Sequence, residues 1–135
     1  MSVTAALLAR AIVEQGPVRY DEATHLITMS RQAGADGDLS AQIIGQGLAA
    51  RVAADRGHHA EAQELANRAV QLAAQTDLLS QHADVLLDLA HVLAAAGHTT
   101  EAHAAATQAL DLHQRKGNLP GVRDSLRYAA QQAPV

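Results

Sequence analysis

The 135-residue sequence lacks cysteine, phenylalanine and tryptophan altogether, and it has only two tyrosines. Without cysteine, the chain can form no disulfide framework, thiolate metal site or cysteine nucleophile. With so few aromatic rings, it cannot bind nucleic acid by stacking bases on aromatic side chains. A β-sandwich or β-barrel is also disfavoured, because such folds fill their cores with β-branched and aromatic side chains.

Lysine is almost absent as well, since Lys116 is the only one, and the formal net charge is −4. This balance argues against a phosphate-binding stripe, so we expect no nucleic-acid partner. The longest apolar stretch near the start, residues 3–13, is interrupted by Arg10 and has no basic leader or cleavage site. No stretch approaches the roughly 20 apolar residues that cross a bilayer. We therefore expect a cytoplasmic protein that does not bind membranes.

Alanine is what the chain has in excess, with 31 residues. The apolar fraction of 48% and the charged fraction of 18% are typical of a globular domain. The length suits one domain, residues 1–135, rather than two. Because alanine and leucine favour helices, the composition predicts an all-α fold.

The sequence also repeats itself. Gly57 and Gly97 are 40 residues apart, and each is followed by histidine and, four and five residues on, by Glu-Ala. Upstream, Gly16 stands in a similar position. A period of this length is typical of helical repeats, in which each repeat is one supersecondary unit.

Each repeat is predicted to be two helices joined at its glycine, which ends the first helix in a left-handed cap. The predicted fold is an α-solenoid of three antiparallel helix pairs and a C-terminal capping helix, seven helices in all. The repeats span about residues 1–37, 38–77 and 78–117, and the capping helix about 119–132. Pro17 is expected early in the second helix, and residues 36–38 and Thr76-Asp77 are expected to supply caps and turns.

Alanines at matching positions of the repeats predict close helix packing. They are Ala9, Ala50, Ala90 and Ala130 in first helices and Ala23, Ala62 and Ala102 in second helices. Larger side chains are expected to fill the gaps between rows, among them Leu8, Leu86 and Leu126. No repeat could bury its apolar face alone, so the repeats must stack.

The spacing of small residues around the turn glycine resembles that of tetratricopeptide repeats. The first helices lack the tryptophan and tyrosine usual in that family, and the period exceeds the family's 34 residues. More narrowly, residues 76–90 (TDLLSQHADVLLDLA) and 112–118 (LHQRKGN) resemble the C-terminal repeats of large bacterial signalling proteins. Those proteins join a nucleotide cyclase or a DNA-binding domain to a P-loop ATPase and then to such helices. The resemblance implies only the helical arm, because no motif of the other domains is visible.

Eight histidines raise the question of a metal site. No two of them have the i, i+4 spacing with which a helix presents two imidazoles to one zinc ion, so we predict no metal and no cofactor. Asp84, Asp88 and His91 could resemble acid–base machinery, and Asp88 could touch His91 one turn later. Nothing in the sequence supplies a nucleophile or an oxyanion partner, so we expect no catalytic residues and no enzyme.

In the tetratricopeptide family, the first helices line the inside of the curve. The resemblance therefore implies a partner-binding concave face that includes Arg10, Arg51, Asp84, Leu87, His91 and Arg127. Arg10 and Arg51 occupy equivalent positions of successive first helices. Two fixed cations with their aliphatic stems on apolar neighbours would suit an acidic peptide with some apolar side chains.

The sequence thus predicts a non-catalytic module that binds a protein or peptide. The resemblance implies that this module is a regulatory or scaffold arm of a bacterial signalling or transcription-regulating system. Two alternatives remain open. One is a homo-oligomerisation module, in which the face of an end helix pairs with a second copy to form a homodimer. The other is a small-molecule sensor, which would need a preformed apolar cavity between the helix layers.

Overall fold

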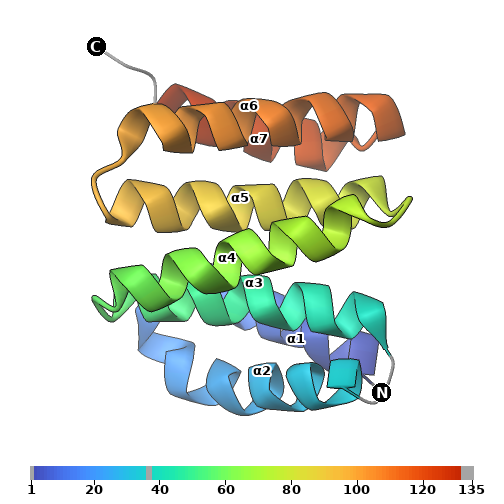
Figure 1. Ribbon diagram of the computed structural model, residues 1–135, viewed down its shortest axis with the longest axis vertical. Coiled ribbons are helices and arrows are strands. Elements are labelled where there is room, and N and C mark those ends of the chain that lie inside the picture. The colour runs from blue at the N-terminus through green and yellow to red at the C-terminus, as the bar shows by residue number, and fades with distance from the viewer. Residues whose placement is uncertain (1, 36–37, 132–135) are drawn as a thin grey trace.

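The computed structural model describes residues 2–35 and 38–131 of the chain. These residues form seven α-helices, one short 3-10 helix and no strand, which confirms the predicted all-α fold (Figure 1). The α-helices are α1 (Ser2–Glu14), α2 (Tyr20–Ala35), α3 (Leu39–Asp55), α4 (His59–Ala74), α5 (Leu79–Ala95), α6 (Thr99–Lys116) and α7 (Leu119–Gln131). The 3-10 helix η1 (Pro17–Arg19) leads into α2 and begins at the expected proline.

Neighbours in the chain are neighbours in space. Each α-helix packs against the next one, within the pairs α1–α2, α3–α4 and α5–α6 and between them. The first helices also form a row of their own, in which α1 contacts α3, α3 contacts α5, and α5 contacts α7. In Figure 1, α1 and α7 lie behind the other helices, near opposite ends of the stack. This order of contacts is what stacked helix pairs require, and the assignment to an α-solenoid stays a prediction.

The turn between paired helices has the same geometry in two repeats. Gly57 and Gly97 have φ angles of 87° and 85°, a left-handed conformation that side chains with a Cβ rarely adopt. The N–H of the next residue then donates to a carbonyl inside the preceding helix, His58 to Ala53 at 2.9 Å and His98 to Leu93 at 2.8 Å. These bonds satisfy carbonyls that the helix end leaves open. The predicted glycine-ended first helices are therefore present.

The links between repeats supply side-chain caps. The Asp38 carboxylate accepts a hydrogen bond from the N–H of Ala41 at 3.0 Å and so caps α3. The rest of the predicted link, residues 36 and 37, lies outside the described residues. In the next link, the Thr76 hydroxyl donates to the carbonyl of Ala73 at 2.7 Å and accepts from the N–H of Leu78 at 3.2 Å.

Six of the seven alanines expected at close helix contacts are fully buried: Ala9, Ala23, Ala50, Ala62, Ala90 and Ala102. The seventh, Ala130, is exposed, because no helix within the described part of the chain covers that side of α7. The prediction that Leu8 and Leu126 fill gaps between helices is wrong for the same reason. They lie on the two end helices and remain 52% and 53% exposed. The repeat pattern therefore predicted burial correctly only where a neighbouring helix exists.

In the described part of the chain, every helix is too short or too polar to cross a lipid bilayer.

Candidate functional site

A cavity of about 320 Å³ opens on the face formed by the first helices. It is lined by Arg10 and Glu14 of α1, Arg51 of α3, Asp84 and Leu87 of α5, and Asp124 and Arg127 of α7. We call it the inner groove. Five of the six residues predicted for the concave face line it, and His91 does not. The residues that the family resemblance placed on one face thus come together from four helices.

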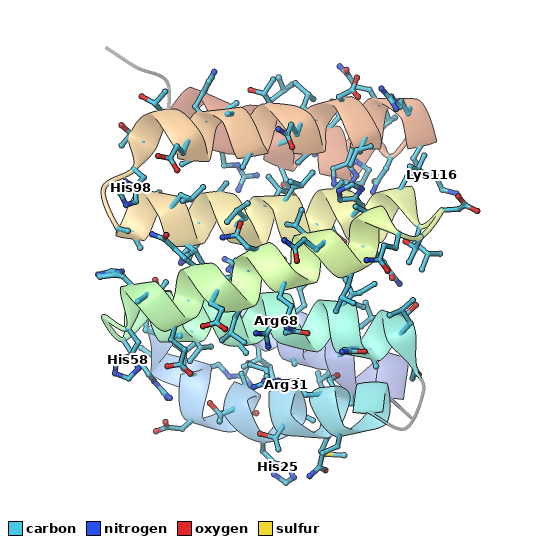
Figure 2. All side chains as sticks on the ribbon, viewed as in Figure 1. His25, Arg31, His58, Arg68, His98 and Lys116 are labelled. Atoms are coloured by element: carbon cyan, nitrogen blue, oxygen red, sulfur yellow. The ribbon has the colours of Figure 1, made fainter. Side chains whose placement is uncertain are left out.

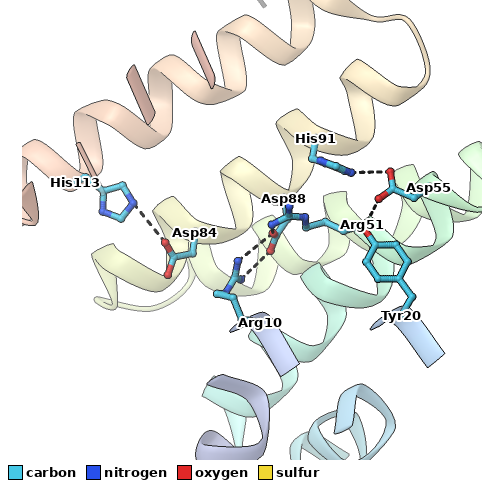
Figure 3. A network of polar contacts seen from close by, with 8 residues as sticks. All are labelled: Arg10, Tyr20, Arg51, Asp55, Asp84, Asp88, His91 and His113. Atoms are coloured by element: carbon cyan, nitrogen blue, oxygen red, sulfur yellow. Dashed lines mark hydrogen bonds and ion pairs between the residues drawn. The ribbon is translucent and has the colours of Figure 1, made fainter. Parts of the chain in front are cut away.

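Asp88 of α5 interacts with both arginines that line the groove, Arg10 and Arg51. Its carboxylate is fully buried and accepts two hydrogen bonds from the Arg10 guanidinium, at 2.9 and 3.2 Å (Figure 3). The Arg51 guanidinium lies 3.5 Å from the same carboxylate. A two-pronged Arg–carboxylate pair is the strongest common form of ion pair, because both N–H groups point along lone pairs of the acid. Asp88 thus ties α1, α3 and α5 together.

Gly47 of α3 makes room for this buried acid. A Cβ atom at position 47 would lie 2.3 Å from Oδ2 of Asp88 and 3.2 Å from a methyl carbon of Val85. Both distances are shorter than ordinary contacts, so a larger residue would push the carboxylate away from the arginines. The close approach of α3 and α5 at Gly47 therefore sets where the acid sits.

Arg10 and Arg51 line the groove as expected, but they are largely buried. Their side chains keep only 14% and 10% of their accessible surface. Burial by itself disfavours the charged guanidinium, but the Asp88 carboxylate outweighs it and raises the pKa of Arg10 above its ordinary value. Both guanidinium groups lie against Asp88 and are largely covered by the protein.

Asp84 lies one turn before Asp88 and faces the inner groove. Its side chain is 41% exposed, and its Oδ1 atom lies 3.5 Å from Nε2 of the buried His113 on α6. Burial of the carboxyl raises the pKa of Asp84, with Asp88 and Glu14 adding to the rise while Arg10 and His113 oppose it. Asp84 is thus a groove carboxylate whose ionised form would be stabilised by a further positive charge nearby.

His113 is held by the turn into α7. The Asn118 Oδ1 atom accepts from the N–H of Gly121 at 3.1 Å, which directs the amide nitrogen toward Nδ1 of His113 at 3.1 Å. Because the amide donates there, the ring proton belongs on Nε2, the nitrogen that faces Asp84. Gly121 packs directly on the ring, since a Cβ atom there would lie 2.3 Å from Nδ1. The contact between α6 and α7 therefore positions the His113 ring beside Asp84.

His91 belongs to a separate cluster beside the groove. Its Nε2 atom lies 2.8 Å from Oδ1 of Asp55, and the hydroxyl of the buried Tyr20 donates to the other oxygen of the same carboxylate (Figure 3). The contact expected between His91 and Asp88 is replaced by this one, because Asp88 points toward the arginines. These bonds join α2, α3 and α5 through one acid.

The accessible charge of the inner groove is mostly negative. Asp84 and Asp124 expose 41% and 55% of their side chains, and Glu14 is also exposed. The exposed cation is Arg127, which lies 3.4 Å from Asp124 one turn earlier on α7. Leu87 gives the groove an apolar wall. The groups that an approaching molecule meets first are three carboxylates and one guanidinium, whereas Leu87 is only 8% exposed.

Within the described ranges, no three His, Asp or Glu side chains come close enough together to share a metal ion. No nucleophile activated by a neighbouring base is found among the polar contacts of the groove residues either.

Sequence reasoning missed the partners Asp88, Asp55, Tyr20 and His113. A usable signal existed for one of them. Asp88 interrupts the apolar run Val85-Leu86-Leu87, and an acid in such a run needs a cation at the same level of a neighbouring helix. Arg10 and Arg51, already assigned to equivalent positions, were the available cations. For the other three, no comparable signal was present.

The fold and the inner groove define an all-α protein with a charged groove across its first helices. The chain matches no family model, no curated protein and no solved structure.

Proposed function

We propose that this protein is a non-catalytic binding module whose inner groove takes a peptide segment with a basic side chain flanked by apolar ones. The observation that carries the proposal is the groove itself, about 320 Å³ lined by residues of four helices. Its volume suits one or two side chains of a peptide that continues along the face of the stack.

The charge of the ligand follows from which groove residues are already paired. Asp88 engages Arg10 and Arg51, so neither presents a full charge to a newcomer. Glu14, Asp84 and Asp124 are the accessible groups, and a lysine or arginine side chain between them would gain from all three. The net charge of −4 would also attract a basic partner at long range.

The acidic peptide expected from the sequence would bind Arg10 and Arg51 as two fixed cations of the groove. Since both are buried against Asp88, an acidic side chain would have to compete with a buried carboxylate while facing three others. The acidic peptide therefore serves as the comparison ligand in the experiment below.

The wider role is proposed on resemblance. A helical arm of a bacterial signalling or transcription-regulating system would hold its partner and relay the binding to an attached domain. Such an arm needs no cofactor and would act in the cytoplasm.

The experiment compares two capped synthetic peptides of equal length, one with lysines flanking a leucine and one with glutamates in their place. Calorimetric titration should give the lysine peptide at least a tenfold lower Kd, about 1.4 kcal/mol. The double variant Glu14→Gln with Asp124→Asn should lose that preference. The control Asp111→Asn removes an exposed acid on α6, away from the groove, and should retain it. Tighter binding of the glutamate peptide, or no saturable binding of either, contradicts the proposal.

A second candidate function is self-assembly through α1. Leu7 and Leu8 are 55% and 52% exposed on this end helix, an unusual exposure for adjacent leucines. Light scattering at two concentrations would detect a dimer. The variant Leu8→Glu should return such a dimer to monomer, and a concentration-independent monomeric mass would exclude the assembly role.

A further inference from the structure

A second cavity, of about 410 Å³, lies where α2, α3 and α4 meet. We call it the outer pocket. It is lined by Thr28, Arg31 and Gln32 of α2, Gln42 and Gln46 of α3, and Arg68 of α4. No carboxylate is among the described residues that line it, although the protein as a whole has a net charge of −4. Two guanidinium groups, three amides and a hydroxyl therefore surround one open space.

Arg31 is set in place by its aliphatic stem. A Cβ atom at position 45 would lie 3.1 Å from Cγ of Arg31, so Gly45 lets this stem lie directly on α3. The Arg31 guanidinium makes no hydrogen bond or ion pair with another described residue. Its N–H groups, five in any arginine, are open to a ligand.

Arg68 stands on the other side of the pocket, and Figure 2 shows it beside Arg31 at the centre of this face. One of its nitrogens donates to Glu64 at 2.8 Å, in an exposed pair one turn apart on α4. Exposed pairs of this kind are weak, and this one uses a single N–H of the guanidinium. Arg68 can therefore turn its remaining donors toward a ligand.

Gln46 places an amide at the wall of the pocket. The residue as a whole is only 5% exposed, and its side chain makes no hydrogen bond with another described residue. Its amide is not among the buried polar groups that lack a partner, so it is open to the cavity. A ligand in the pocket could therefore accept a hydrogen bond from this amide in place of water.

From these contacts we infer that the outer pocket binds a small oxyanion with two negative charges, either a phosphate group or a dicarboxylate. Arginine presents paired N–H donors that match two oxygens of a carboxylate or a phosphate, and two arginines balance two charges. The glutamines and Thr28 would donate to the remaining oxygens. The site shares only the helix α3 with the inner groove, so either site can fail without the other.

The test uses nuclear magnetic resonance titration of the ¹⁵N-labelled protein with inorganic phosphate and, separately, with succinate. Sodium chloride keeps the ionic strength constant, because exposed charges respond to salt alone. We expect saturable shifts of the side-chain amide signals of Gln42 and Gln46 and of the Nε–H signals of Arg31 and Arg68. Saturation by phosphate alone identifies a phosphoryl ligand, saturation by succinate alone a carboxylate ligand, and saturation by both an oxyanion site of broad specificity.

The variants Arg31→Gln and Arg68→Gln should each raise the Kd at least tenfold without lowering the melting temperature, because both side chains are exposed. The matched control Arg115→Gln removes the same charge from an exposed position on α6 and should bind like the parent. Gln46→Leu should weaken binding as well. The inference is overturned if neither anion saturates these signals, or if Arg115→Gln weakens binding as much as the pocket variants do.

Discussion

Arg10 and Asp88 lie 78 positions apart in the chain, yet two parallel hydrogen bonds of 2.9 and 3.2 Å join them. Arg10 belongs to the first helix pair and Asp88 to the third, so the bond spans the whole middle pair. Arg51 of that middle pair approaches the same carboxylate from 3.5 Å. One buried acid therefore holds the first helices of three repeats in register and forms the base of the inner groove.

Replacing this acid should be the most damaging change in the groove. Asp88→Ala removes the buried carboxylate that both nearly buried guanidinium groups approach, and we expect a loss of about 3–5 kcal/mol in the free energy of unfolding. Urea denaturation measures it. Asp111→Ala, which breaks an exposed pair with Arg115, should cost under about 1 kcal/mol. Equal losses in the two variants would mean that Asp88 is not the link between the repeats.

Gly47→Ala tests the same link from the opposite helix. Inside a helix, alanine is normally better than glycine by about 0.5–1 kcal/mol. Here the new methyl group would lie 2.3 Å from the Asp88 carboxylate, so we expect a destabilisation of about 1–3 kcal/mol instead.

A double-mutant cycle shows whether this cost arises at Asp88. In the Asp88→Ala background, Gly47→Ala should cost clearly less than in the parent, since the oxygen that it collides with is gone. Additive losses would place the strain elsewhere, for example at Val85.

The alanines between helices give a third prediction. Ala90→Leu and Ala102→Leu place large side chains at fully buried contacts, and each should destabilise the protein by about 1–3 kcal/mol. Ala130→Leu makes the same change on the exposed side of α7 and should be close to neutral. Thermal melting of the three variants measures the difference, and a similar loss at Ala130 would show that the packing register is wrong.

The pKa of Asp84, raised by burial, gives opposite pH dependences for stability and for binding. Between the ordinary pKa of 3.8 and the raised folded value, the native state holds a proton that the unfolded state has lost. Stability therefore falls as the pH rises through this window. The lysine peptide should bind more tightly over the same window, because it gains from the ionised carboxylate.

Asp84→Asn separates this acid from the others. In the variant, stability and binding should both change less with pH than in the parent, and the variant should bind the lysine peptide above the window more weakly than the parent. Chemical denaturation and calorimetric titration across the pH range measure the two effects. If parent and variant show the same pH profiles, another group titrates in this window and Asp84 does not face the bound peptide.

The sequence was sufficient to predict the helices and their buried faces where the same local pattern repeats. Gly57 and Gly97 end helices at a fixed interval, and the alanines that follow them recur because every repeat packs in the same way. That register placed Arg10, Arg51 and Leu87 correctly on one face. It failed at Leu8 and Leu126, since the end helices lack the neighbour that the rule assumes.

The groove chemistry could not be predicted in the same way, because it depends on which side chains meet across helices. The sequence predicted that Arg10 and Arg51 are cations on the same face. Their pairing with Asp88 could not be predicted, because it depends on how close α1 lies to α5 and on the space that Gly47 leaves for the carboxylate. His91 had two acids within reach, Asp88 on its own helix and Asp55 on α3. It is the packing of α3 against α5 that brings Asp55 to His91.

Binding of a basic peptide in the inner groove can be observed by nuclear magnetic resonance, with the lysine peptide titrated into the ¹⁵N-labelled protein. Amide signals of α1, α5 and α7 near Glu14, Leu87 and Arg127 should shift and saturate together, while those of α4 and the outer side of α6 stay in place. Shifts concentrated on α2, α4 or α6, or no saturable shift around Leu87, would show that the peptide does not bind in the inner groove.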